Sequence, residues 1–178
     1  MNHTPDLRVL PRLIDARKMA HQGSDLVGII PIRALDRLQS ALESDEGDVS
    51  LVLSLGIDQQ GLAVVTGTVK ADVLVLCQRC LSPMTYPVDT EVSLAIVPSE
   101  ERAKELPKRL DPWFVTDNAA DLYSLVEDEI LLALPMVAYH QQACLKPEAY
   151  SSGDDSSDQK GEKPNPFSVL EQLKGSPK

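Results

Sequence analysis

A run of alternating apolar residues between Leu62 and Val97 constrains the fold of this chain more than any other stretch. Apolar side chains recur at every second residue on both sides of a central break, which is the period of a β-strand with one buried face. Cys77 and Cys80 lie in the break, and Ser82-Pro83 marks a turn. The run therefore predicts two strands, over residues 62–76 and 86–97, joined by a turn that carries both cysteines.

The flanking sequence extends this hairpin into an α+β fold. Residues 49–57 alternate in the same way and predict a third strand, so that the three consecutive strands form an antiparallel β-meander. Helical spacing predicts a shorter helix that starts at Pro31 and reaches Leu42, and a longer helix over 119–135 that Asp117-Asn118 caps. We expect these two helices to cover the sheet, within a single domain over residues 8–150.

Several smaller elements are expected around this framework. Residues 11–20 favour a strand, residues 27–30 an edge strand, and residues 99–110 one or two helical turns that Ser99 caps. Gly67 suggests a bulge or bend within its strand. Trp113 and Phe114 are expected in a loop, where they would form a lid on a core that has few other aromatic residues or, alternatively, an anchor for a partner.

The C-terminal part has a different composition. Residues 151–163 contain no large apolar side chain and predict a disordered acidic linker. Residues 164–174 predict a short amphipathic segment with Asn165 as N-cap, Pro166 at the first helical position, and Phe167, Leu170 and Leu173 on one face. So short a helix is unstable alone, and it would dock either on its own domain or on a partner.

The charge of the chain points to a basic partner. The net charge is −10 and the isoelectric point is about 4.7, which disfavours broad phosphate neutralisation and hence unaided nucleic-acid binding. Glu127, Asp128 and Glu129 form an acidic triplet that could bind a basic protein or, less favourably, a divalent metal, and the alternative interpretation is an exposed helical face. The alternative is direct RNA contact through the basic residues Arg8, Arg12, Arg17, Lys18 and Arg79.

The three cysteines cannot form a complete set of disulfides, and the N-terminus has no apolar signal core. We therefore expect a cytoplasmic protein with reduced thiols, no membrane span and no small-molecule substrate. Cys77-x-x-Cys80 is half of a zinc knuckle, and His140 with Cys144 could supply the other half of a Cys3His site. A redox dithiol and buried reduced thiols remain alternatives. The sequence contains neither a glycine-rich phosphate-binding loop nor a paired nucleophile and base, so no motif indicates catalysis.

Three stretches carry a resemblance to a known family: GTVKADVLVLCQRCLSPM, LVEDEILLALPMVAYH and KPNPFSVLEQLK. In this order and spacing they resemble the YceD family of bacterial large ribosomal RNA subunit accumulation proteins, from about Pro11 to Lys174. The positions that match the family signature are Cys77, Arg79, Cys80, Glu127, Asp128, Glu129, Pro135, Asn165, Pro166 and Phe167. Many relatives have more cysteines after the helix than the lone Cys144, which weakens the zinc hypothesis for this chain.

The resemblance implies a cytoplasmic, non-enzymatic protein that supports synthesis, processing or stability of 23S ribosomal RNA. Combined with the net charge of −10, it suggests binding to a basic ribosomal protein or a large-subunit precursor, with indirect or weak contact to the RNA itself. The acidic triplet would provide the charge, and the Phe167/Leu170/Leu173 face would provide an apolar anchor. A metal-dependent enzyme of RNA processing is the least favoured alternative.

Overall fold

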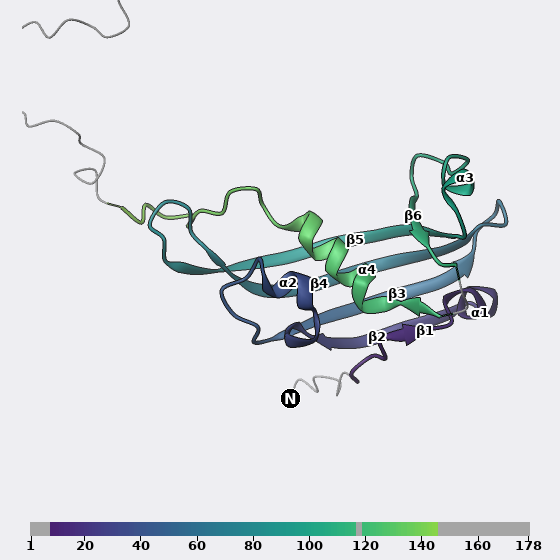
Figure 1. Ribbon diagram of the computed structural model, residues 1–178, viewed down its shortest axis with the longest axis horizontal. Coiled ribbons are helices and arrows are strands. Elements are labelled where there is room, and N and C mark those ends of the chain that lie inside the picture. The colour runs from purple at the N-terminus through teal and green to yellow at the C-terminus, as the bar shows by residue number, and fades with distance from the viewer. Residues whose placement is uncertain (1–7, 117–118, 146–178) are drawn as a thin grey trace, which may run out of the picture. The chain divides into compact units, whose positions relative to one another are not determined.

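The computed structural model describes residues 8–116 and 119–145 (Figure 1). In chain order these residues form β1 (Leu13–Ile14), α1 (Ala16–Gln22), β2 (Ser24–Pro31), η1 (Ile32–Ala34), α2 (Asp36–Gln39), β3 (Asp48–Ile57), β4 (Ala63–Leu76), β5 (Pro83–Val97), α3 (Glu100–Ala103), β6 (Asp111–Phe114), β7 (Ala120–Asp121) and α4 (Leu122–Ala133). The expected linker 151–163 and the C-terminal segment 164–174, with Asn165, Pro166, Phe167, Leu170 and Leu173, lie outside the described residues.

The fold is α+β, and the predicted meander is its centre. The main sheet has the order β2-β3-β4-β5-β6, in which β3, β4 and β5 are antiparallel neighbours. The short apolar piece expected at the sheet edge is part of β2, which pairs with β3. The sequence prediction of a loop over residues 111–114 was wrong, because this segment is β6 and pairs parallel with the end of β5.

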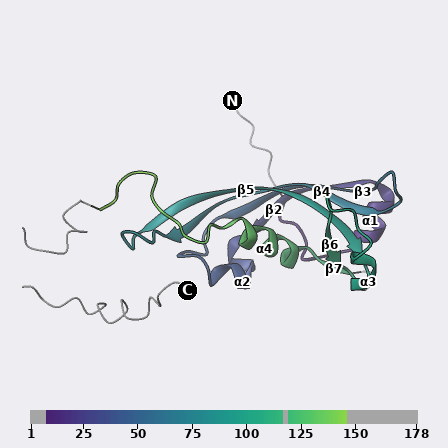
Figure 2. The same cartoon turned by 90° about the horizontal axis from the view of Figure 1, so that it is seen from above.

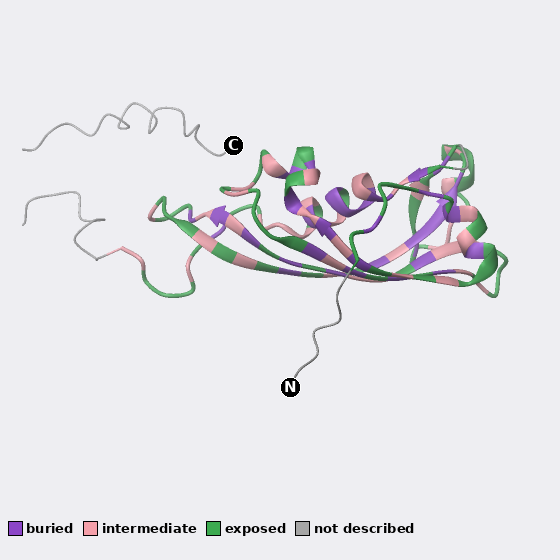
Figure 3. Ribbon diagram, turned by 90° about the horizontal axis from the view of Figure 1, so that it is seen from below, coloured by how far each residue is buried: buried purple, intermediate pink, exposed green. Residues whose placement is uncertain are grey.

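The helices lie on one face of the sheet, where α4 and α2 cover its concave side (Figures 1 and 2). The period-two pattern of the strands decides which side chains face them. Along β3, Val49, Leu51, Leu53 and Leu55 are buried while the alternate residues are partly or fully exposed (Figure 3). The core lies between this face and the apolar stripe of α4, which is formed by Leu122, Leu125, Val126 and Ile130.

The long helix starts later than its sequence suggested. Asp121 is the N-cap of α4, since its side chain accepts a hydrogen bond from the Ser124 N–H at 3.0 Å. Burial would raise the pKa of Asp121, but this N–H and the guanidinium of Arg12 outweigh burial and hold the pKa below its usual range. The predicted cap, Asp117-Asn118, lies outside the described residues.

Two other predictions from local pattern were wrong. Half of residues 11–20 is helical: Asp15 caps α1 by accepting from the Lys18 N–H, and only the two residues of β1 form a strand. The helix expected from Pro31 to Leu42 is two short pieces, η1 and α2, because Leu35 departs from helical geometry with φ −112° and ψ 83°. Ile32, Leu35 and Leu38 are nevertheless buried as their spacing requires.

The aromatic pair at residues 113–114 is divided between core and solvent. Trp113 is partly buried and packs against the core, whereas Phe114 is 51% exposed. At the next predicted helical segment, α3 covers only Glu100–Ala103, and Ser99 makes no side-chain capping hydrogen bond.

Gly67 lies in an unbroken strand rather than at a bulge. Its register continues across both neighbours, with Leu53 on β3 and Val92 on β5 as its partners. The backbone there has φ +152°, and a Cβ would lie 2.0 Å from the Val52 carbonyl oxygen. Glycine is therefore required at this position by the close approach of β3.

Gly67→Ala should destabilise the protein by at least about 2–3 kcal/mol, because the new methyl group clashes with backbone that cannot move aside. Gly56→Ala is the matched control, since no atom lies within 4 Å of the added Cβ at that position in β3. Its effect should stay within about 1 kcal/mol. Urea denaturation of both variants measures the difference, and equal stabilities would contradict the close approach.

Candidate metal centre and charged surfaces

Four metal-ligating side chains from two distant segments meet at one end of the sheet. Cys77 and Cys80 lie at the tip of the β4–β5 hairpin, and His140 and Cys144 lie on the segment that follows α4. Their potential ligand atoms are all within 4.8 Å of one another. The structure thus brings together the four donors that the sequence nominated.

Backbone hydrogen bonds shape the hairpin tip around the first cysteine. The Cys77 N–H donates to the Ser82 carbonyl at 3.0 Å, and the Leu81 N–H donates back to the Cys77 carbonyl at 2.9 Å. Leu81 takes the left-handed φ of 56° that glycine usually supplies in such a turn. The turn therefore forms without a glycine beside the cysteines.

One backbone hydrogen bond joins the two segments of the site. The Gln78 N–H donates to the Ala138 carbonyl at 2.8 Å. Beside it, the Arg79 guanidinium lies over the Tyr139 ring, 5.1 Å from its centroid. Sequence patterns had not singled out Tyr139, because a lone tyrosine in an irregular segment carries no periodic signal. These contacts place His140 and Cys144 opposite the hairpin tip.

Two of the separations between donor atoms are close to those of a tetrahedral zinc ion. The Cys77 and Cys144 Sγ atoms are 3.8 Å apart, and the Cys80 Sγ is 3.4 Å from the His140 Nδ1. Zinc bonds of about 2.3 Å to sulfur and about 2.0–2.1 Å to nitrogen imply separations of about 3.8 and 3.6 Å across a tetrahedron. All three cysteines are free. The donor set could therefore hold a metal ion.

The pKa values of the Cys77 and Cys144 thiols are shifted in opposite directions. Burial alone would raise the pKa of Cys77, but the backbone N–H groups of Cys80, His140 and Arg79 lower it to about 5. Burial and the neighbouring sulfur atoms raise the pKa of Cys144. The pair lies at a hairpin tip and not at a helix N-terminus, so the lowered pKa of Cys77 matches a redox dithiol but the position in the fold does not.

The basic residues nominated for RNA contact do not form one patch. Arg12 pairs with Asp121 at 3.0 Å, and Arg17 donates to the Val115 carbonyl at 2.7 Å. Arg8 and Lys18 are exposed. Arg79 lies at the hairpin tip, at the opposite end of the sheet from α1 (Figure 1).

The acidic triplet is divided between interior and surface. The expectation of three exposed carboxylates was wrong for Glu127, which is only 5% exposed. Its carboxylate accepts hydrogen bonds from the Arg37 N–H at 2.7 Å and from the Leu38 N–H at 3.4 Å, and it also pairs with the Arg37 guanidinium. Glu127 therefore caps α2 from the neighbouring helix.

The other two members of the triplet stay near the surface. Asp128 is exposed and lies 2.6 Å from the Arg37 guanidinium. Glu129 is half-buried, and its pKa is raised by burial and by the nearby carboxylates of Asp111 and Asp128. Carboxylates are therefore crowded where α4 approaches the beginning of β6, and the partner-binding role of Asp128 and Glu129 stays a prediction.

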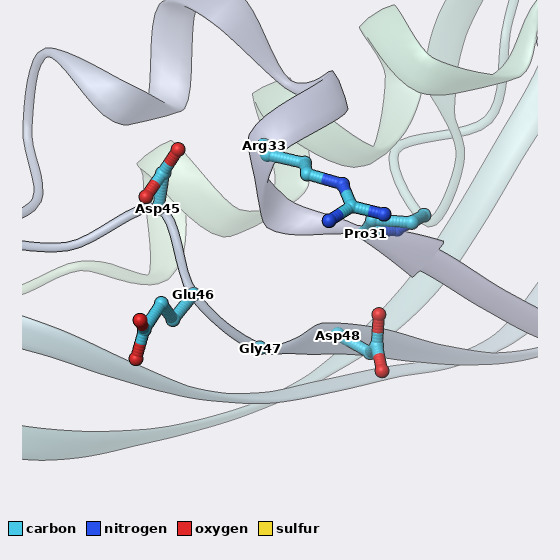
Figure 4. A pocket seen from close by; sticks show the side chains of 6 residues that line it. All are labelled: Pro31, Arg33, Asp45, Glu46, Gly47 and Asp48. Atoms are coloured by element: carbon cyan, nitrogen blue, oxygen red, sulfur yellow. The ribbon is translucent and has the colours of Figure 1, made fainter.

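A further polar pocket lies beside the start of β3. Its lining consists of Pro31, Arg33, Asp45, Glu46, Gly47 and Asp48 (Figure 4). The carboxylates spread around the pocket and point in different directions, so they do not converge on one ligand position. Within residues 8–116 and 119–145, the Cys3His cluster is the candidate metal group.

The described helices include none with the length and apolar character needed to cross a membrane. The site and fold together define an α+β protein in which a Cys3His cluster links a long hairpin to the segment after the main helix.

Comparison with known proteins gives the family. A family model described as "Large ribosomal RNA subunit accumulation protein YceD" matches residues 65–174. The chain is 34% identical over 167 residues to a Haemophilus influenzae protein of that same name, with 93% of this chain and 96% of the relative covered. The chain therefore belongs to the YceD family. No solved structure matches it.

Glu127→Ala should lower the free energy of unfolding by about 2–3 kcal/mol, because it leaves the first N–H groups of α2 without their charged acceptor. Asp128→Ala is the matched control, since Asp128 pairs with the same guanidinium but is exposed. Its cost should be below about 1 kcal/mol. Chemical denaturation of both variants tests this, and a larger loss in the Asp128 variant would contradict the capping role.

Proposed function

We propose that the protein supports the accumulation of 23S ribosomal RNA, as a non-catalytic factor of large-subunit biogenesis in the bacterial cytoplasm. The observation that best supports this proposal is family membership, because a relative that aligns with nearly the whole chain has a name that describes this role. The accumulation of an RNA can be raised by a protein that binds and protects its precursor particle, so the proposal requires a binding surface and no catalytic group.

The charge distribution favours a protein partner over naked RNA. The chain carries a net charge of −10, and several arginines are engaged with carboxylates within the fold: Arg12, Arg37, Arg102 and Arg109 each form an ion pair. A surface of this kind repels phosphate and attracts cationic polypeptide. The proposed partner is therefore a basic ribosomal protein or a large-subunit precursor that exposes one.

Zinc at the Cys3His cluster is the second part of the proposal. Cys77, Cys80, His140 and Cys144 would hold the ion, which would supply a structural cross-link when bound. The supporting observation is the agreement of the Sγ–Sγ separation of 3.8 Å with a tetrahedral site. The Gln78–Ala138 hydrogen bond and the turn closed by Leu81 would position the four donors around the ion.

The purified protein should contain about one equivalent of zinc, and His140→Ala should reduce both the zinc content and the melting temperature. His21→Ala is the matched control, because His21 is an exposed histidine on α1 outside the cluster. Elemental analysis and thermal unfolding, with and without chelator, measure both effects. The proposed metal would be refuted if the purified wild-type protein contains no zinc and its melting temperature is unchanged by chelator.

Cells that lack the protein should contain less 23S relative to 16S ribosomal RNA, and the wild-type gene should restore the ratio. A tagged copy should sediment with large-subunit precursors in a lysate gradient. Retention on the particles after mild RNase treatment supports contact through protein, and complete release supports direct RNA binding. An unchanged ratio in the deletion strain, with the tagged protein at the top of the gradient, would refute the proposed function.

A further inference from the structure

The long strand β5 has an open edge over most of its length. It contains 15 residues, but β6 pairs only with Leu94–Val97 at its end. Among the residues that the structure describes, no strand pairs with the outer side of 84–93. Figure 1 shows β5 continuing along the border of the sheet well beyond β6. An open edge of this length is a template for one more strand.

The hydrogen bonds at the two ends of β5 show which backbone groups face outward. At the hairpin turn the Cys77 N–H donates to the Ser82 carbonyl, so residue 82 faces β4. Because the facing direction alternates along a strand, the even-numbered residues of β5 also face β4. The Val97 carbonyl accepts from the Val115 N–H on the other side, as this alternation requires.

Odd-numbered residues of β5 therefore present their backbone to the open side. Thr85, Asp89 and Glu91 each aim an N–H and a carbonyl outward, and Pro87 aims only a carbonyl. A proline at this position costs no hydrogen bond with β4. The Ser93 hydroxyl donates to the Arg109 carbonyl at 3.2 Å, which ends the open stretch. The edge available for pairing is thus Thr85–Glu91.

Carboxylates border this edge on both faces of the sheet. The side chains of Asp89 and Glu91 are exposed on the outer face, and Lys70 pairs with only one of them, Asp89, at 2.8 Å. On the helix side, Asp111 and Glu129 lie close enough for the Asp111 charge to raise the pKa of Glu129. The edge therefore lies in a negative field that an added positive charge would relieve.

A pocket adjoins the same edge beside the candidate metal centre. It has a volume of about 490 Å³ and is lined by Met84, Thr85, Tyr86, Pro87, Tyr139, His140 and Gln141. Met84 and Tyr86 project from the inner face of β5, while Tyr139 comes from the segment that carries the metal ligands. An added strand would place alternate side chains at this mixed aromatic and aliphatic surface.

We propose that the edge Thr85–Glu91 of β5 binds an extended, Lys/Arg-rich polypeptide segment of a partner protein as an additional strand. This inference rests on the proposed function and specifies how the basic partner is held. Backbone hydrogen bonds to β5 give the affinity, and the flanking carboxylates select a cationic strand. A second copy of this chain fits poorly, because it would bring a second set of the same carboxylates, Asp89 and Glu91, to an edge that already carries them.

The test uses the full chain and a fluorescent peptide of alternating Lys and Val residues. The peptide should bind, and hydrogen exchange at the amides of Thr85, Asp89 and Glu91 should slow when it is added. Thr85→Pro removes one outward N–H without a change of charge, and Asp89→Lys reverses one charge; each should weaken binding at least about tenfold. Asp25→Lys, on the edge strand at the other side of the sheet, should leave the affinity unchanged.

Three results would overturn the inference. One is full affinity in both β5 variants, and another is strong protection of these amides before any peptide is added, which would mean that the edge is already paired. The third is equal protection of the edge by an oligouridine RNA. Circular dichroism of each variant verifies that the fold is intact, and because the two β5 variants change different properties, misfolding of one leaves the other as the test.

The ribosomal RNA assay separates this inference from the proposed function. If the wild-type gene fails to restore 23S ribosomal RNA, the proposed function is refuted. Peptide binding at β5 is then still decided by the binding assay alone. If the wild-type gene restores the RNA and the folded Thr85→Pro variant restores it equally, the edge is not the partner site and the inference is overturned.

Discussion

A buried carboxylate holds the helical layer of this protein together. Glu127 reaches from α4 to the first N–H groups of α2 and pairs with the Arg37 guanidinium, so the two helices that cover the sheet are fixed to each other. Because α4 is fixed, the chain leaves it in a set direction, and the Ala138 carbonyl meets the Gln78 N–H of the hairpin tip. The gathering of His140 and Cys144 with the hairpin cysteines follows from this course of the chain.

The hairpin also explains why the proposed metal cross-link would lie at its tip. Strands β4 and β5 contain 14 and 15 residues, and their joined end extends beyond α4 (Figure 2). In the turn, Gln78, Arg79 and Leu81 are exposed, whereas Cys77 is buried beside the segment that follows α4. A two-stranded ribbon is only marginally stable by itself. If the four donors bind a metal ion, it would supply at this point the stability that a helix supplies elsewhere.

The sequence predicted what depends on local pattern. Period-two alternation identified β3, β4 and β5, and the need for four nitrogen or sulfur donors led from Cys77 and Cys80 to His140 and Cys144, which the structure brings together. Long-range contacts were out of reach. The parallel pairing of β6 and the burial of Glu127 depend on partners remote in the chain, 90 residues away for the Arg37 N–H. A glutamate within an acidic triplet gives no local sign of such a partner.

The candidate metal centre and the open edge of β5 are parts of one structural unit. The segment that supplies His140 and Cys144 also supplies Tyr139 and Gln141 to the wall of the pocket beside Met84–Pro87. If the four donors hold zinc, this wall is fixed relative to β5, and a partner strand meets a preformed surface instead of ordering the segment as it binds. Loss of the metal would then weaken binding of the partner, because His140 and its neighbours in the pocket wall would lose their fixed position.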